Sequence, residues 1–121
     1  MNPNAYVGFF TLYIMSIILS TTPNIEGKQI VQTLGLVTGN TIRARDALTD
    51  FKAGLKGDTI GGELKGYTEM LSHARKEAIE RMVKEAEDLG SNAIVAVRFS
   101  TSHVREGAAE LLAYGTAVKV E

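Results

Sequence analysis

Cysteine is absent from this chain of 121 residues, and its absence excludes several kinds of site at once. A chain without thiols forms no disulfide, holds no thiolate-ligated zinc ion and has no cysteine nucleophile. It also fits a reducing compartment, so we expect a cytoplasmic protein. An excess of positive charge is lacking too, because the formal net charge is −1 and basic residues are interspersed with acids. Nucleic acid is therefore not expected as a partner.

Basic residues are missing from the first 27 positions, which hold a single charged residue, Glu26. Within them Ala5–Leu19 is strongly apolar. A secretory signal would begin with basic residues, and a membrane span needs about 20 apolar residues, whereas this run is shorter. We expect residues 1–14 to be an N-terminal extension, from an upstream start codon or as an added element, and residues 15–121 to form a single domain. The alternative is membrane association through residues 5–19.

Two strand-like segments precede the first helical pattern. Residues 16–22 end at Pro23, which suits a strand exit because proline donates no backbone hydrogen bond. Residues 29–38 are rich in Ile, Val, Leu and Thr and predict a second strand. In residues 42–56 apolar side chains recur with the period of one helix face and predict a short helix. The glycines of residues 57–66 predict a loop.

The second helical pattern is longer and more regular. In residues 64–89 apolar side chains recur every three or four positions, and Gly90 follows as a C-cap. Residues 92–101 and 110–120 predict two further strands, joined by a hairpin loop over residues 102–109. The order β-β-α-α-β-β favours the α+β class, as a largely antiparallel four-stranded sheet with two helices on one face.

Two of the predicted strands lack the alternation that is typical of a sheet with one face in water. Ala93–Val97 and Leu111–Tyr114 carry no polar break. Helices can cover one face of the sheet, so another layer must cover the second face. A second subunit is the simplest such layer, and we expect a homo-oligomer. The alternative is that the apolar N-terminal extension folds back over that face.

Short motifs follow one another in a fixed order from Ser20 to Lys119. They are Ser20-Thr21-Thr22-Pro23, Gly35-Leu36-Val37-Thr38-Gly39, Asp50-Phe51, Gly61-Gly62, Tyr67, Ala74-Arg75, Leu89-Gly90-Ser91-Asn92-Ala93 and Gly115-Thr116-Ala117-Val118. In this order they resemble the YbjQ-like family, small prokaryotic proteins of uncharacterised function described as "putative heavy-metal-binding". The resemblance implies an α+β subunit that assembles into a ring, with a pentamer expected. It implies no known reaction.

Metal ligands in this chain would be nitrogen and oxygen atoms. The methionines on the long helix are expected to fill the core rather than to bind soft metals. Glu69, His73 and Glu77 are spaced i, i+4, i+8, so they share one face of the long helix and could chelate a divalent metal ion. His103 lies in the predicted hairpin loop, which a ring would repeat around its axis. The competing interpretation is an ordinary solvated helix face and an exposed loop histidine.

A ligand site is the other candidate. The glycine-rich loop with Gly61 and Gly62 precedes a helix N-terminus, where free N–H groups can bind anions, although it lacks the nucleotide-binding pattern Gly-x-x-x-x-Gly-Lys-Ser/Thr. Asp50, Tyr67 and Arg75 are the candidate residues of an interface active site.

Our leading hypothesis is a homo-oligomeric ring that binds a small ligand or a metal ion between subunits without chemistry. An enzyme with an interface active site is one alternative. The other is a scaffold that the N-terminal extension tethers to the membrane.

Overall fold

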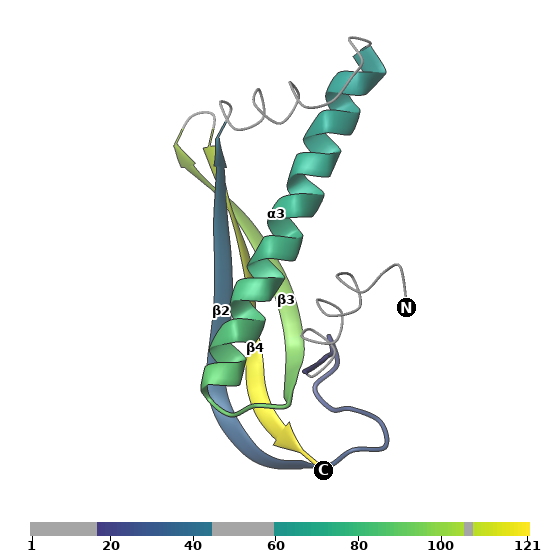
Figure 1. Ribbon diagram of the computed structural model, residues 1–121, viewed down its shortest axis with the longest axis vertical. Helices are drawn as coiled ribbons and strands as arrows, with labels where there is room; N and C mark the ends of the chain where they lie inside the picture. Colours follow the sequence, from purple (N-terminus) through teal and green to yellow (C-terminus); the bar gives the residue numbers. More distant parts are fainter. Residues whose placement is uncertain (1–16, 45–59, 106–107) are drawn as a thin grey trace, which may run out of the picture.

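A computed structural model describes residues 17–44, 60–105 and 108–121 of the chain (Figure 1). Its elements are β1 (Ile18–Leu19), β2 (Ile30–Ala44), α3 (Ile60–Asp88), β3 (Ala93–Arg105) and β4 (Ala108–Val120). The strands form one sheet in the order β1-β3-β4-β2, and α3 lies along one face of it. β2 and β3 run antiparallel to β4, whereas β1 runs parallel to β3. The α+β class is confirmed, and the sheet is mixed.

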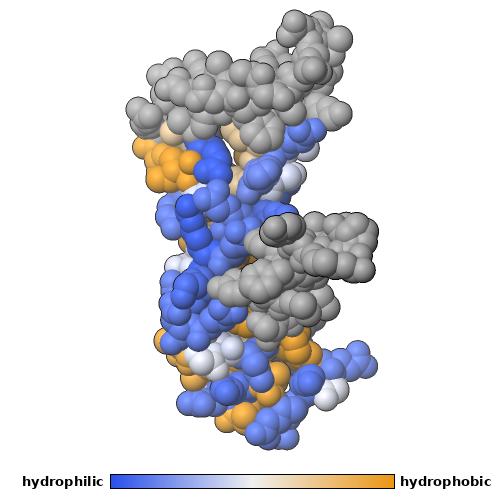
Figure 2. Space-filling model, viewed as in Figure 1, coloured by the Kyte–Doolittle hydropathy of each residue, from blue (hydrophilic) through white to orange (hydrophobic). Residues whose placement is uncertain are grey.

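α3 buries a stripe of small and flexible side chains against the sheet. The fully buried residues of the stripe include Ala74, Ala78, Met82 and Ala86. The helix ends in a Schellman motif, in which Ser91 N–H donates to the Ala86 carbonyl at 3.0 Å and Gly90 N–H donates to the Glu87 carbonyl at 2.9 Å. Gly90 has the positive φ of 81° that this motif needs. The outward side of α3 is mainly hydrophilic (Figure 2), as its charge pattern predicts.

α3 and β2 approach each other to backbone contact at Gly39. A Cβ atom at this position would lie 2.0 Å from the Ala78 carbonyl oxygen and 2.5 Å from the Met82 nitrogen. Only glycine lets a strand and a helix lie this close. Apolar side chains of the three long strands fill the core around this contact: Val37, Ile94, Val97, Ala113 and Ala117.

The opposite face of the sheet is covered by the chain itself at one end. A second apolar cluster lies there, formed by Ala93, Val95, Val118 and Val120, with Ile18, Ile25 and Ile30 packed against it. Successive residues of a strand point to opposite faces, so the run Ala93–Val97 is apolar because it feeds both clusters. Part of the cover that we expected from a second subunit therefore comes from residues 18–30.

Two predicted elements between β2 and α3 differ from the structure. Residues 42–44 of the predicted short helix continue β2, because they pair with residues 108–110 of β4, and the rest of that prediction lies outside the described residues. The predicted loop at residues 57–66 is wrong from Ile60 onward, where α3 begins. Within the described residues one helix, rather than two, covers the sheet.

The predicted hairpin loop at residues 102–109 is wrong in extent. β3 continues to Arg105 and β4 begins at Ala108. Thr101, Ser102 and His103 pair with residues 109–111 of β4, so ladder hydrogen bonds extend the strands through a polar segment.

The apolar N-terminal run enters the sheet at its end. Ile17 is buried, and Ile18 and Leu19 form β1, while residues 1–16 lie outside the described residues. Across residues 17–44, 60–105 and 108–121, no helix has both the length and the apolar character needed to cross a membrane.

Candidate functional site

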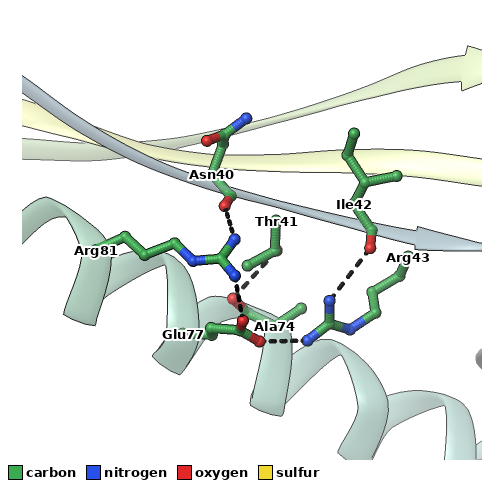
Figure 3. Close-up of polar contacts among 7 residues, drawn as sticks. All are labelled: Asn40, Thr41, Ile42, Arg43, Ala74, Glu77 and Arg81. Atoms are coloured by element: carbon green, nitrogen blue, oxygen red, sulfur yellow. Dashed lines mark hydrogen bonds and ion pairs between the residues drawn. The ribbon is translucent and has the colours of Figure 1, made fainter.

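A polar network joins α3 to β2 around Glu77 (Figure 3). Arg43 of β2 donates to Glu77 Oε2 at 2.6 Å, and Arg81 donates to Glu77 Oε1 from one turn further along α3. Arg81 also donates to the Asn40 carbonyl. Beside them the Thr41 hydroxyl, which is buried, donates to the Ala74 carbonyl at 3.3 Å. The network therefore fixes α3 on β2 along residues 40–43, directly after their contact at Gly39.

The charge of Glu77 is set by these arginines. The hydrogen bond from Arg43 is the main cause that lowers the pKa of the Glu77 carboxyl, and the positive charges of Arg81 and Arg43 act in the same direction. Partial burial opposes them. Each carboxylate oxygen already accepts a hydrogen bond from an arginine, so a metal ion at Glu77 would be repelled by two neighbouring positive charges.

The other predicted metal ligands lie on the same side of the sheet. Glu69 and His73 are in α3, two turns and one turn before Glu77, respectively. His103 is in β3, opposite Ala109, and Ala109 is opposite Arg43, so this row faces α3. Among the residues that the structure describes, no three His, Asp or Glu side chains are grouped so as to hold a metal ion. A site at these positions stays a prediction.

The methionines on α3 are core residues, as predicted. Met70 is 5% exposed and Met82 is fully buried. Their thioether sulfur atoms are therefore not offered to a metal ion at the surface.

The residues predicted for a ligand or active site are spread along α3 and beyond it. Asp50 lies outside the described residues. Gly61 and Gly62 are the second and third residues of α3, so they do not form the predicted loop before the helix. Tyr67 is also in α3, and Arg75, on its surface, donates to the Ser72 hydroxyl at 3.1 Å. Their role stays a prediction.

A second constellation, which the sequence analysis missed, joins β3 to the loop after β1. β3 contains a bulge, because Ala96 and Val97 together oppose Gly115 of β4. Ala96 has φ of 55°, and no other non-glycine residue that the structure describes has a positive φ. The bulge turns two N–H groups outward: Ala96 donates to the Thr22 carbonyl and Val97 to the Ser20 carbonyl, each at 2.9 Å.

Arg98 follows the bulge, and one end of its guanidinium group is fixed. Nη1 donates to the Thr21 carbonyl at 2.7 Å and to the Val97 carbonyl at 2.8 Å. The opposite residue on β4 is Tyr114, and Tyr114 lies opposite Thr38 on β2. Thr38 neighbours Gly39, whose Cα approaches α3, so the row of Arg98, Tyr114 and Thr38 lies on the face away from α3. In the sequence, the signal for Arg98 as a candidate site residue was its position as a single charged residue directly after the apolar run of β3.

The loop after β1 is held by its own hydroxyl groups. The Ser20 and Thr22 hydroxyls are hydrogen-bonded to each other, and Thr22 N–H donates to Ser20 Oγ at 3.1 Å. The Thr22 hydroxyl donates in turn to the Asn24 carbonyl. The loop is thereby shaped to present its carbonyl groups to the bulge and to Arg98.

The face away from α3 stays open beyond the second apolar cluster. On β2, Leu36 is 68% exposed and Ile42 is 56% exposed. Their neighbours on β4 on the same face, Leu112 and Tyr114, are half-buried. Apolar surface also shows at the end of the strands where the β3–β4 hairpin lies (Figure 2, orange, upper left).

Comparisons with known proteins agree on one family. The family model described as "Putative heavy-metal-binding" matches residues 17–121. A UPF0145 protein of Halorubrum lacusprofundi is 53% identical over 102 residues, which cover 84% of this chain and 97% of that protein. One of Thermosipho africanus is 53% identical over 104 residues, which cover 86% of this chain and 95% of that protein.

A solved structure shares the fold. It is a protein of unknown function of the DUF74 family from Pediococcus pentosaceus, with a TM-score of 0.53 and 16% identity, covering 87% of this chain and 98% of that one. The family match spans every element of the described fold, from β1 to β4. The chain therefore belongs to the YbjQ-like family, whose function is uncharacterised and whose description is "putative heavy-metal-binding".

Proposed function

We propose that the protein is a homo-oligomeric ring that binds a small ligand or a metal ion between its subunits. The observation that carries the proposal is the half-open face of the sheet. Leu36 and Ile42 stand exposed there beside the half-buried Leu112 and Tyr114. Burying apolar side chains stabilises a complex by about 25 cal/mol per Å² of apolar surface removed from water. A second copy of the chain is always available to cover these apolar side chains.

The edges of the sheet support a ring rather than a closed dimer. Among the described residues, β2 pairs only with β4, so its outer edge is unpaired from Ile30 to Ala44. The outer edge of β3, away from β4, is paired only as far as Val97, and no described segment pairs with Arg98–Arg105 on that edge. Unpaired edges are sites where another chain adds. Since these two edges differ, joining one to the other is a head-to-tail contact, and such contacts close into a ring when the rotation from copy to copy adds up to a full turn.

The chemistry of the ligands supports a metal ion of intermediate hardness. The family description names heavy metals, yet this chain offers imidazole and carboxylate groups and no thiolate. Imidazole suits Zn²⁺ and Cu²⁺. His73, His103 and Glu69 lie on the side of the sheet where α3 packs, and a neighbouring copy would have to complete the ligand set.

The oligomer is tested by sedimentation of the full chain and of matched variants. Leu36→Lys and Ile42→Lys place a charge on the open face, and we expect each to lower the sedimenting mass toward that of one protomer. Leu89→Lys is the control, because Leu89 is 46% exposed at the other end of the fold, just after α3. A wild-type chain that sediments as one protomer at high concentration contradicts the proposal.

The metal ion is tested separately. Titration with Zn²⁺ or Cu²⁺ is expected to show saturable binding that the double variant His73→Ala, His103→Ala loses. An affinity that the double variant leaves unchanged removes both histidines from the site, whatever the oligomeric state.

A further inference from the structure

We propose that Arg98 anchors a binding site for an anionic group with two or more oxygen atoms, a carboxylate or a phosphate, on the sheet face away from α3. The residues that carry the site belong to one protomer: Arg98, the loop that holds it, and Tyr114 across from it. The site therefore goes beyond the ring proposed above and does not depend on it.

The free donors of the guanidinium group define the ligand. Nη1 is engaged by the Thr21 and Val97 carbonyls. Nε and Nη2 make no hydrogen bond or ion pair with any residue in the described part of the chain. These two nitrogens share one edge of the planar group, and their N–H bonds are parallel. That edge matches the two oxygens of a carboxylate or a phosphate and accepts them as a bidentate pair.

The guanidinium group is positioned before any ligand arrives. An exposed arginine ordinarily loses rotamer freedom when it binds, and that loss weakens the complex. Here two carbonyl groups already hold Nη1, and the loop that supplies one of them is tied to the bulge by the N–H groups of Ala96 and Val97. Much of the ordering is therefore complete in the free protein.

The bulge itself indicates a function. A non-glycine residue with positive φ, such as Ala96, has a strained backbone, and such residues cluster at binding and active sites. Bulges change the direction of the side chains that follow them. Without the extra residue in β3, the side chain of Arg98 would point to the α3 side of the sheet. The bulge at this strained residue therefore places the positively charged Arg98 side chain on the sheet face away from α3.

The neighbours of Arg98 suit an anion. Tyr114, directly opposite on β4, is half-buried, and its hydroxyl has no hydrogen-bond partner among the described residues. The Thr21 hydroxyl likewise has none among them. Glu110, the acid of β4 on this face, accepts a hydrogen bond from the Asn40 amide at 3.1 Å. The row therefore offers donors to an added group, and no carboxylate of the described segments contacts Arg98.

Titration with inorganic phosphate and with acetate tests the site, followed by amide and arginine Nε–H signals in nuclear magnetic resonance spectra. In the wild-type chain either anion is expected to shift the Nε–H signal of Arg98 and the amide signals of Ala96 and Val97 in a saturable way. Arg98→Lys keeps a charge and can still bond the two carbonyls, but it loses the parallel donor pair. We expect it to weaken phosphate binding by at least about tenfold. Lys119→Gln, at an exposed lysine of β4, is the control and is expected to leave the affinity unchanged.

Three results would overturn this assignment. They are an Arg98 Nε–H signal that neither anion moves, an equal affinity in Arg98→Lys, and a loss of oligomer mass in Arg98→Lys without any response to free anions. The last result would mean that a carboxylate of a neighbouring copy occupies Arg98. A wild-type chain that is monomeric and still binds phosphate through Arg98 contradicts the ring and supports the anion site, so the two proposals fail separately.

Discussion

Replacing Gly39 with alanine tests the contact between α3 and β2, on which the described fold depends. The added Cβ would lie 2.0 Å from the Ala78 carbonyl oxygen and 2.5 Å from the Met82 nitrogen. Both are backbone atoms, which no change of rotamer can move. An ordinary contact requires at least 3.4 Å, so the helix and the strand would have to separate by more than about 1 Å.

The expected loss of stability follows from that displacement. Overpacking ordinarily lowers the free energy of unfolding by about 1–3 kcal/mol. The loss stays in that range because neighbouring side chains can move to make room. Here such relaxation is blocked, and the hydrogen bond from Thr41 to the Ala74 carbonyl would lengthen as well. We therefore expect Gly39→Ala to lower the free energy of unfolding by about 3 kcal/mol or more.

Denaturant unfolding at one fixed protomer concentration measures this, because assembly would otherwise shift the transition. Gly90→Ala is the matched control. Gly90 has open space around its Cβ position and a φ of 81°, so the same substitution there adds backbone strain of about 1 kcal/mol without a clash. If Gly39→Ala destabilised the chain no more than Gly90→Ala, the close contact would be refuted.

Two further predictions concern charge and strain. Because its pKa is lowered in the folded chain, Glu77 contributes stability that is fully present above the ordinary pKa of glutamate and is lost as pH falls through the lowered value. Glu77→Gln should therefore lower the free energy of unfolding near neutral pH, by less than about 1 kcal/mol since the carboxylate is partly solvated. The difference should vanish in acid, and a constant difference across pH contradicts the ion pairs. At Ala96, glycine relieves the positive φ, so Ala96→Gly should leave stability unchanged or raise it by up to about 1 kcal/mol. The same change at Ala86 in α3 should lower stability by at least about 1 kcal/mol, and equal losses at the two sites contradict the strain.

The fold was predictable from the sequence where the spacing of the apolar residues fits only a helix or only a strand. The stripe from Ala74 to Ala86 matches the helix period and is buried as expected. Residues 42–44 were misassigned because their spacing also fits a helix, and only the pairing with β4, more than 60 positions away, decides for a strand. Gly61 and Gly62 favour a loop locally, yet α3 includes them, since the propensity of two glycines costs only about 2 kcal/mol.

The candidate sites were less predictable, because they depend on register. The spacing of Glu69, His73 and Glu77 identified one helix face correctly, but it could not show that Arg43 from β2 reaches Glu77. The bulge at Ala96 has no local signal, since alanine rarely takes a positive φ. It arises from the loop carbonyl groups that its N–H groups meet, and these contacts exist only in the folded chain.

Native mass spectrometry of the intact chain tests the central claim most directly, because it reads the number of subunits and any retained ligand in one measurement. If the open face of the sheet and its two unlike edges are completed by further copies, the mass will be a whole multiple of 13.1 kDa, with more than two subunits. A single species at 13.1 kDa across the accessible concentration range would contradict it.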